Sequence, residues 1–590
     1  MLKNFFISML GAIAGFWISM MLMVVVGFAV VIGSAASAFV SSQSTNTSIE
    51  KESVLEICFD SDIEERPTPR NFEAVLNQSP GSQTLPNILR AIRAAKDDDR
   101  IEGIYLKCDG SAAGFATREA ITRALVDFKK SGKWIMAYAD SYMQGDYYMA
   151  SCADYLYLNP AGSVDVRGIT STIPFFKGLL DKVGVEMQVF KVGTYKSAVE
   201  PYILDNMSDA NREMTQFFIN NIWNGIASRI AENRGVKVAT VNQWADSLVA
   251  FDSPQQLVDL KVVDALKYAD EVEEELKGMT NVKKGKDLRL IDYAAYNTLT
   301  DAPHEKKEKN KIAVYYACGD ITDDGDGGIT ATNVVPDILD LAKDDDIQAL
   351  VLRVNSGGGS AYASEQIWHA LEVFKSKGKT FYVSMGDYAA SGGYYISCGA
   401  EKIYAEPSTL TGSIGIFGMI PCAKELITDK LGVNFGVVST NANGAFPSLF
   451  EPATPFQAQR LQGSINRGYE LFTSRCAEGR HIPQDSIKAI GEGRVWDGRT
   501  AKKLGLVDEL GGLQATIDAL AKKMDYDKYQ VVVYPEVEKS FWDVIAEMPT
   551  QVKANALREE LGTYYPVYME LKRLENLEPV QARMMPVTLQ

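Results

Sequence analysis

The chain has 590 residues, of which 46% are hydrophobic and 23% charged, and its net charge is −16. This length exceeds what one hydrophobic core organises, so several domains are expected. The acidic balance argues against nucleic acid as a partner, because phosphate binding needs clustered lysine and arginine. The seven cysteines are scattered singly, and nothing in the sequence implies a metal site or an organic cofactor.

The amino-terminal residues 5–32 contain no charged side chain. About 20 apolar residues cross a bilayer core, whereas a cleavable signal peptide has an apolar core of roughly 7–15 residues. We therefore predict an uncleaved transmembrane signal anchor over residues 1–40, with cleavage as the alternative. Lys3 precedes the span, which places the short amino terminus in the cytoplasm. The remaining chain is expected on the extracytoplasmic side of the cell (inner) membrane, held by a single pass that contacts lipid.

The remaining chain repeats itself. Residues 101–110 (IEGIYLKCDG) match 347–356 (IQALVLRVNS), and residues 181–190 (DKVGVEMQVF) match 429–438 (DKLGVNFGVV). Matching runs in the same order at long spacing indicate a duplicated domain rather than a solenoid. In each copy, apolar strand-like runs alternate with amphipathic helical stretches, which predicts βαβ units and a mostly parallel α/β sheet. The predicted organisation is an anchor (1–40), a first domain (41–300), a charged linker (301–310), a second domain (311–535) and a tail (536–590).

Residues 355–360 (NSGGGS) follow a predicted strand and precede a predicted helix in the second copy only. Consecutive glycines let backbone N–H groups face a ligand, and a following helix N-terminus suits an anion. A plain tight turn is the alternative. No lysine follows the glycines in the phosphate-loop pattern, so nucleotide binding is not expected.

Ser391 lies among small residues in the run 389–395 (AASGGYY), where the first copy has Gln144. A serine in such surroundings is open to a substrate carbonyl. The N–H of Gly392 is then placed to form an oxyanion hole together with the loop at Gly358. The alternative is a serine that caps the following helix.

Lys196 lies in the run 193–201 (GTYKSAVEP), and the equivalent region of the second copy has no lysine. If this lysine is buried, its neutral amine is favoured and can act as a general base towards a serine. The alternative is a solvated lysine on a surface loop. Only three histidines occur, none near Ser391 in sequence, so a base other than histidine is expected.

Four motifs in order resemble those of the bacterial signal peptide peptidases of the large, internally duplicated type. They are GTYKSAVEPY (193–202), VNSGGGS (354–360), DYAASGGYYIS (387–397) and TGSIGIFG (411–418). The resemblance implies the α/β fold of the Clp protease and crotonase superfamily, here as two tandem domains after the transmembrane helix. One departure is Gly357, where the family usually has proline.

The resemblance implies a role for each matching residue. Ser391 matches the nucleophile and Lys196 the general base, while Gly358 and Gly392 match the oxyanion donors. Ser413 is a candidate for orienting the lysine. Because Ser391 and Lys196 come from different copies, the site is expected where the copies meet. The small residues of the loop 412–418 predict a substrate groove, which is lined by Gly412, Ile414 and Gly415.

The predicted function is that of a membrane-anchored serine endopeptidase with a Ser-Lys dyad that degrades apolar peptides, by resemblance cleaved signal peptides. The resemblance also implies a ring-like homo-oligomer, by analogy a tetramer. Two alternatives remain open. One is a catalytically inactive membrane-tethered scaffold, and the other is a crotonase-like enzyme acting on acyl-CoA, which the acidic balance disfavours.

Overall fold

A computed structural model of the chain describes residues 49–66, 83–280, 282, 287–300, 308–325, 327–536 and 580–583. The predicted anchor over residues 1–40 lies outside these residues, and so do residues 301–307 of the predicted linker. Within the described ranges, no helix is long and apolar enough to cross a membrane.

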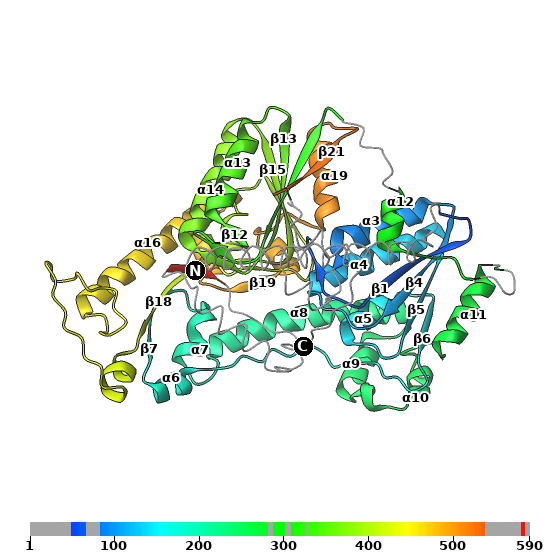
Figure 1. Cartoon of the computed structure of the whole chain (residues 1–590), viewed down its shortest axis with the longest axis horizontal. Helices are drawn as coiled ribbons and strands as arrows, with labels where there is room; N and C mark the ends of the chain where they lie inside the picture. Colours follow the sequence, from blue (N-terminus) through cyan, green and yellow to red (C-terminus); the bar gives the residue numbers. More distant parts are fainter. Residues whose placement is uncertain are drawn as a thin grey trace, which may run out of the picture. The chain divides into compact units, whose positions relative to one another are not determined.

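The first copy forms a six-stranded sheet in which every paired neighbour is parallel (Figure 1). Its strand order is β8-β6-β5-β4-β1-β9. The strands are β1 (Ser53–Phe59), β4 (Ile101–Cys108), β5 (Trp134–Ala139), β6 (Tyr155–Leu158), β8 (Ala265–Leu266) and β9 (Leu290–Asp292). In the central strands β1, β4, β5 and β6, most apolar residues are buried because helices cover the sheet, as expected for a parallel sheet joined by helical crossovers.

The second copy repeats this topology, since its strands follow the order β20-β16-β15-β13-β10-β21. These strands are β10 (Lys311–Cys318), β13 (Ile347–Ser356), β15 (Thr380–Ala390), β16 (Lys402–Ala405), β20 (Glu509–Leu510) and β21 (Gln530–Tyr534). Strands β17 (Leu410–Gly412) and β19 (Val495–Asp497) extend the far end of β15. The shared strand order confirms the duplication and the α/β fold class.

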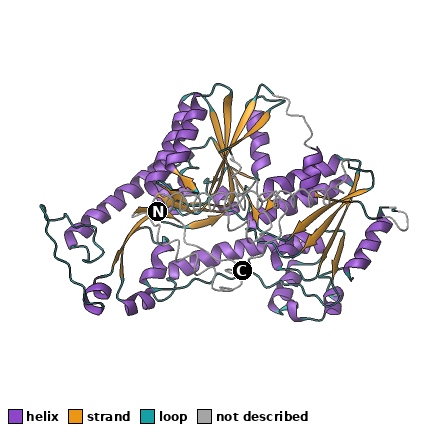
Figure 2. Cartoon of the chain, in the orientation of Figure 1, coloured by secondary structure: helices purple, strands orange, loops and turns teal. Residues whose placement is uncertain are grey.

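Helices flank both sheets (Figure 2). Those of the first copy are α3 (Leu85–Asp97), α4 (Phe115–Phe128), α5 (Gln144–Ala150), α6 (Lys177–Val183), α7 (Glu200–Ile203), α8 (Asp209–Arg234), α9 (Val238–Asp246), α10 (Pro254–Asp259), α11 (Ala269–Met279) and α12 (Tyr293–Thr300). Those of the second are α13 (Ala331–Lys343), α14 (Ala361–Ser376), α15 (Gly392–Tyr395), α16 (Pro455–Arg480), α17 (Gln484–Ile490), α18 (Gly498–Lys503) and α19 (Leu513–Lys523).

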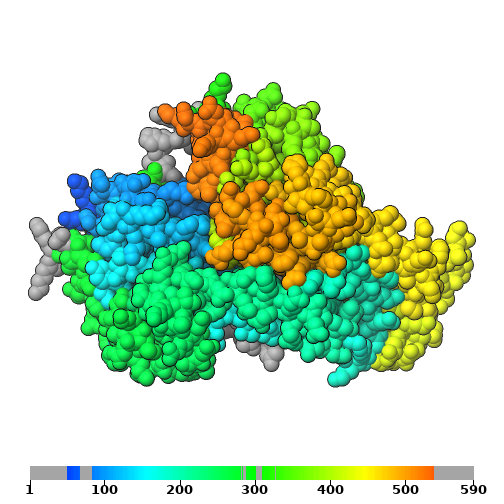
Figure 3. Space-filling model, turned by 180° about the vertical axis from the view of Figure 1, so that it is seen from behind, coloured from blue at the N-terminus to red at the C-terminus, as the bar shows by residue number. Residues whose placement is uncertain are grey.

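The long helices α8 and α16 occupy equivalent places in the two copies, and each begins at a side-chain cap. Ser208 accepts a hydrogen bond from the Asn211 N–H, and Thr454 accepts one from the Gln457 N–H. Each helix also contacts the other copy, because α8 packs against β19 and α16 packs against β7 (Glu186–Val192). Figure 3 shows α8 (teal) lying along the orange residues of the second copy. The two copies are therefore interleaved.

A third sheet joins segments of both copies in the order β12-β11-β14-β22-β18-β7. Its remaining strands are β11 (Ile321–Thr322), β12 (Ile329–Thr330), β14 (Gly358–Ser360), β18 (Ile416–Cys422) and β22 (Val580–Arg583), while β2 (Ile63–Glu64) and β3 (Gln83–Thr84) form a separate pair. Strand β7 of the first copy lies antiparallel to β18 of the second, with Val192 opposite Ile416 (Figure 1). This exchange brings the residues after β7 beside those that precede β18.

Candidate active site

Ser391 lies in a sharp turn between the end of β15 and the start of α15. Its φ of 55° is in the left-handed region, which is costly for a residue with a side chain. The Ser391 N–H donates to the Gly412 carbonyl at 2.8 Å, and the Ser391 carbonyl accepts from the Tyr395 N–H at 2.9 Å. Although Ser391 occupies the N-cap position of α15, its side chain makes no capping hydrogen bond, so the helix-cap alternative is wrong.

Lys196 reaches Ser391 from the first copy. Its Nζ lies 2.8 Å from Ser391 Oγ, 3.1 Å from Ser413 Oγ and 3.2 Å from the Ser413 carbonyl oxygen. Lys196 is only 1% exposed and Ser391 is fully buried, so the alternative of a solvated surface lysine is wrong. The structure thus brings together the three side chains that the sequence singled out.

Burial lowers the pKa of the Lys196 amine well below its usual range. Among the residues that the structure describes, the hydrogen-bond partners of Lys196 Nζ are oxygens of Ser391 and Ser413. A buried amine with no carboxylate beside it loses hydration without gaining an ion pair. The surroundings therefore favour the neutral amine, which is the form that can accept a proton.

The loop at residues 491–494 of the second copy holds both Lys196 and Ser413. The Tyr195 N–H donates to the Glu492 carbonyl at 2.9 Å, and the Ser413 N–H donates to the Arg494 carbonyl at 2.7 Å. A Cβ on Gly493 would lie 2.7 Å from Lys196 Cα, so no side chain fits there. The lysine backbone is consequently seated against a loop that also fixes its serine partner.

Glu200 organises the chain that follows Lys196. It is 2% exposed, and its carboxylate accepts hydrogen bonds from Ser208 Oγ at 2.6 Å and from Asn211 Nδ2 at 2.9 Å. These bonds fasten α7 to the first turn of α8. Glu200 was not among the residues predicted from the sequence, although a carboxylate within an otherwise small and apolar run indicates a group that needs partners.

The predicted oxyanion donors lie next to the Ser391 turn. Ser356 pairs with Ala389 across β13 and β15, and a Cβ on Gly393 would lie 2.7 Å from the Ser356 carbonyl oxygen. Gly358 has a φ of 101°, and its N–H donates to Ser356 Oγ at 3.1 Å. Gly392 opens α15, so its N–H belongs to a first turn whose donors have no intrahelical acceptor.

Of the predicted groove residues, Gly415 lies against Lys196 and Gly412 against Ser391. Ile414 is fully buried in the core, and a Cβ on Gly415 would lie 3.2 Å from Lys196 Cδ. Gly412 has a φ of 79°, and its carbonyl receives the Ser391 N–H. The structure therefore shows Gly412 and Gly415 as close neighbours of the Ser391–Lys196 pair, while the role of all three as substrate contacts stays a prediction.

Helix α4 of the first copy contacts β15, the strand that leads into the Ser391 turn. Asp387 on β15 accepts hydrogen bonds from the Thr117 N–H at 3.0 Å and from Thr117 Oγ1 at 2.7 Å. Burial raises the pKa of the Asp387 carboxyl. Asp387 precedes Ser391 in the same motif, so this contact between the copies lies close to the turn.

A buried ion pair joins the second copy to Glu65 of the first. Arg353 on β13 and Glu65 are both almost fully buried, and their closest contact is 2.5 Å between Nη2 and Oε1. Arg353 Nη1 also donates to Ser384 Oγ at 2.9 Å. This pair was not predicted from the sequence, where its only signal is an arginine inside an apolar strand.

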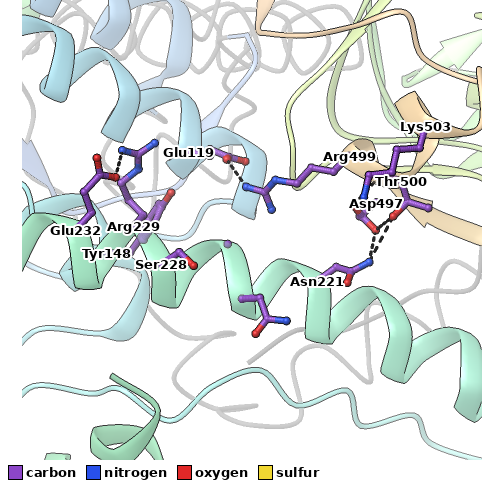
Figure 4. A pocket seen from close by; sticks show the side chains of 12 residues that line it. Glu119, Tyr148, Asn221, Ser228, Arg229, Glu232, Asp497, Arg499, Thr500 and Lys503 are labelled. Carbon is purple, nitrogen blue, oxygen red and sulfur yellow. Dashed lines mark hydrogen bonds and ion pairs between the residues drawn. The ribbon is translucent and has the colours of Figure 1, made fainter. Parts of the chain in front are cut away.

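A polar cleft of about 450 Å³ lies between α8 and α18 (Figure 4). Arg499 lies 3.5 Å from Glu119, and Asn221 Nδ2 donates to Asp497 Oδ2 at 2.7 Å. Neither Ser391 nor Lys196 lines this cleft. The polar contacts that line this cleft connect the two copies. The serine–lysine pair lies outside the cleft.

Comparison with known proteins supports the class that the fold defines. The family model for Clp protease matches residues 324–410, which include β13, the glycine loop and the Ser391 turn. The model "Peptidase family S49" matches residues 113–283 and 373–527, one segment in each copy. The fold and these matches define a protease of the Clp-like α/β class with a tandem duplication.

The chain belongs to peptidase family S49. It is 37% identical to "Protease 4" of Salmonella typhi over 82% of this chain and 79% of that protein. It is 36% identical to "Protease 4" of Haemophilus influenzae over 73% of this chain and 72% of that protein. It is also 29% identical to "Serine protease SPPA, chloroplastic" of Arabidopsis thaliana, over 85% of this chain and 74% of that protein.

Proposed function

We propose that this protease is a serine endopeptidase in which Ser391 is the nucleophile and Lys196 the general base. The observation that carries the proposal is the 2.8 Å approach of Lys196 Nζ to Ser391 Oγ within a buried site. A hydroxyl beside a neutral amine is an activated nucleophile, and Ser-Lys pairs are an established variant of serine catalysis. The relative from Arabidopsis thaliana is itself named a serine protease.

The reaction follows from these positions. The neutral amine of Lys196 takes the Ser391 Oγ proton as Oγ attacks a peptide carbonyl, and the protonated amine then gives a proton to the departing amine. Water, deprotonated by the same lysine, hydrolyses the resulting ester. The N–H groups of Gly358 and Gly392 stabilise the tetrahedral oxyanion, which requires the Gly358 N–H to turn from or share its bond with Ser356 Oγ.

Ser413 acts as the positioning residue for the base. Its hydroxyl and carbonyl oxygens lie 3.1 Å and 3.2 Å from Lys196 Nζ, on the same nitrogen that faces Ser391. These two oxygens hold the amine of Lys196, and its remaining direction points at the Ser391 hydroxyl. This arrangement favours the orientation of the amine that allows proton transfer between Lys196 and Ser391 over its other orientations.

The substrates that we propose are apolar peptides, with cleaved signal peptides as the natural class. The support is the motif resemblance, together with the charge-free stretch of residues 5–32, which we propose as a single membrane anchor beside such substrates. We also propose the predicted domain boundaries, extracytoplasmic placement and a homo-oligomer, by resemblance a tetramer. The dyad shared between the copies supports an enzyme rather than a scaffold.

The test is hydrolysis of a fluorogenic apolar peptide by the full chain in detergent, with Ser391→Ala and Lys196→Met as variants. Ser376→Ala, which removes an exposed serine at the end of α14, is the matched control. We expect both dyad variants to lose activity and the control to keep it. Full activity in a folded Ser391→Ala variant would rule out Ser391 as the nucleophile.

A further inference from the structure

The loop that leads into β19 is tied by its backbone to both segments that carry the candidate site. Besides the bonds that Tyr195 and Ser413 donate to this loop, the Gly493 N–H donates to the Ile414 carbonyl at 2.8 Å. Glu492 and Gly493 have φ values of 53° and 79°, both in the left-handed region. Such backbone is costly at Glu492 and persists only where its surroundings hold it in place.

The last residue of this loop, Arg494, lies among three aromatic rings. Its guanidinium carbon is 4.5 Å from the centre of the Tyr195 ring, 4.7 Å from that of Trp496 and 5.9 Å from that of Phe217. Its Nη2 also pairs with Glu213 Oε1 at 2.7 Å. Two of the rings and the carboxylate belong to the first copy, so this one side chain connects the copies beside the site.

The contacts of Arg494 explain why an arginine is needed there. Its Nε is buried and has no hydrogen-bond partner among the described residues. The Glu213 side chain is 59% exposed, so the ion pair alone contributes little. The rings are therefore the main support, because an aromatic face attracts a cation and a planar guanidinium stacks on it. A lysine keeps the charge but has no flat surface to stack.

Arg494 holds the base and the partner of the base at the same time. Its side chain stacks on Tyr195, which directly precedes Lys196. Its carbonyl accepts the Ser413 N–H at 2.7 Å, and the Ser413 hydroxyl lies 3.1 Å from Lys196 Nζ. A shift of Arg494 would consequently move both sides of the lysine.

We propose that Arg494 is a positioning residue for the general base: its guanidinium, stacked on Tyr195, keeps Lys196 Nζ within reach of Ser391 and away from water. This inference rests on the proposed serine–lysine chemistry and adds the group that fixes the base. Misplacing a reacting group by about 1 Å costs up to roughly a hundredfold in rate. Because Arg494 acts through Tyr195 rather than on the substrate, its loss is expected in kcat and not in KM.

The first experiment compares Arg494→Lys with the parent in hydrolysis of a fluorogenic apolar peptide by the full chain in detergent. The control is Arg229→Lys, which alters an arginine on α8 that pairs with Glu232 at 2.7 Å. We expect Arg494→Lys to lower kcat about tenfold or more with KM within about twofold, and the control to match the parent. Parent kcat in a folded Arg494→Lys variant would overturn the proposal.

The pH dependence distinguishes positioning of the base from general packing. Burial lowers the pKa of the Lys196 amine, and the amine of Lys191 lies 3.4 Å from the Lys196 carbonyl oxygen. Arg494→Lys changes neither the charge at residue 494 nor that at Lys191. Access of water to the Lys196 amine then brings its pKa closer to the usual range, so the rising limb of kcat should move to higher pH. A lower kcat with an unmoved limb would indicate a packing role and overturn the proposal.

A second pair of variants covers the case in which Arg494→Lys does not fold. Tyr195→Leu removes the ring on which the guanidinium stacks. Tyr195→Phe keeps that ring and removes only the hydroxyl, which lies 3.5 Å from Glu213 Oε2. We expect Tyr195→Leu to reproduce the loss of kcat and the displaced pH limb, and Tyr195→Phe to match the parent. Equal kcat in the two variants would count against a stacked positioning residue.

Hydrogen–deuterium exchange tests the inference without catalysis. Mass spectrometry follows the amides of residues 193–202 in the Ser391→Ala background, with Arg494→Lys or Tyr195→Leu added. We expect exchange there to become about tenfold faster or more, while exchange in β4 stays unchanged. This result supports the positioning role even if Ser391 is not the nucleophile. Unchanged exchange in residues 193–202, or an equal increase in β4, would overturn it.

Discussion

The two copies share a framework and differ at the turn after the third strand of each sheet. In both, the helix after that turn is held by a tyrosine hydroxyl. Tyr147 donates to the Val262 carbonyl at 2.8 Å in the first copy, and Tyr394 donates to the Leu506 carbonyl at 3.0 Å in the second. The framework therefore serves both copies, and the chemistry depends on what the turn itself contains.

At the turn the two copies use their side chains differently. In the first, Gln144 accepts hydrogen bonds from the Arg167 N–H at 2.8 Å and the Gly168 N–H at 2.9 Å, and the preceding residue, Met143, has an ordinary φ of −69°. In the second, Ser391 has a φ of 55°, and its Oγ faces Lys196. Strained backbone is thus found in the copy whose side chain is directed at a reactive partner, as expected of a functional turn.

The largest expected effect comes from removing the buried amine. Lys196→Met should lower kcat/KM by roughly a thousandfold or more, because no described neighbour can replace the base. The same variant should raise the Tm at neutral pH, since it removes an amine whose burial is unfavourable. Peptide hydrolysis and thermal unfolding measured on one preparation test both effects. Lower stability with full activity would mean that Lys196 only supports packing.

The pH dependence of the parent follows from the same burial. Because the pKa of Lys196 is lowered and the neutral amine is the base, kcat/KM should rise with pH and level off above that pKa. The folded state binds this proton less readily than the unfolded state. The contribution of Lys196 to stability therefore also increases with pH, between its folded and unfolded pKa values. A kcat/KM that falls as the pH rises through the lowered pKa of Lys196 would contradict a neutral lysine base.

A second comparison pairs Arg353 on β13 with Lys107, its counterpart on β4. Arg353 is 2% exposed and paired with Glu65, whereas the Lys107 side chain is 43% exposed and lies 3.4 Å from Asp109. Arg353→Met should cost about 3–5 kcal/mol of unfolding free energy, because it leaves the Glu65 carboxylate buried without a partner. Lys107→Met, the matched control, should cost less than about 1 kcal/mol.

Urea unfolding followed by circular dichroism measures both variants. The informative quantity is the difference between them, since both remove a cation from the same position of an equivalent strand. Similar losses would mean that the buried pair contributes no more than the exposed one.

The sequence predicted the parts of this structure that depend on local pattern. Apolar strands alternating with amphipathic helices predicted the α/β class, and the copied segments predicted the duplication; both are confirmed. The comparison of copies also singled out Lys196 and Ser391, which the structure places in contact. Their catalytic roles stay a prediction.

Contacts between residues far apart in the chain could not be predicted from the sequence. A charged residue inside an apolar strand, such as Arg353, indicates that a partner exists, but periodicity does not say that it is Glu65. The exchange of β7 against β18 was missed for the same reason, because strand pairing across the copies leaves no local signature. Strand β22 is a four-residue segment whose pairing depends entirely on the edges that receive it.

Ser413 tests how closely the base is positioned. Ser413→Ala removes the hydroxyl at 3.1 Å from Lys196 Nζ and leaves the carbonyl at 3.2 Å. We expect kcat to fall about tenfold, with KM nearly unchanged and the rising limb of the pH profile displaced. Ser413→Thr, which keeps the hydroxyl, is the conservative comparison. Equal loss in both variants with an unmoved pH profile would indicate a packing role only.

The smallest expected effect lies in the first copy. Gln144→Ser restores a serine at the place equivalent to Ser391, yet it should produce no peptidase activity when combined with Ser391→Ala. Met143 and Gln144 follow ordinary backbone geometry, and the second copy carries no lysine equivalent to Lys196 that could reach the new hydroxyl. The only consequence should be a loss of about 1 kcal/mol in stability, from the hydrogen bonds that Gln144 makes to the loop at Gly168. Activity in the double variant would show that a base lies within reach of residue 144, so that the two copies differ by one side chain rather than by the backbone of the turn.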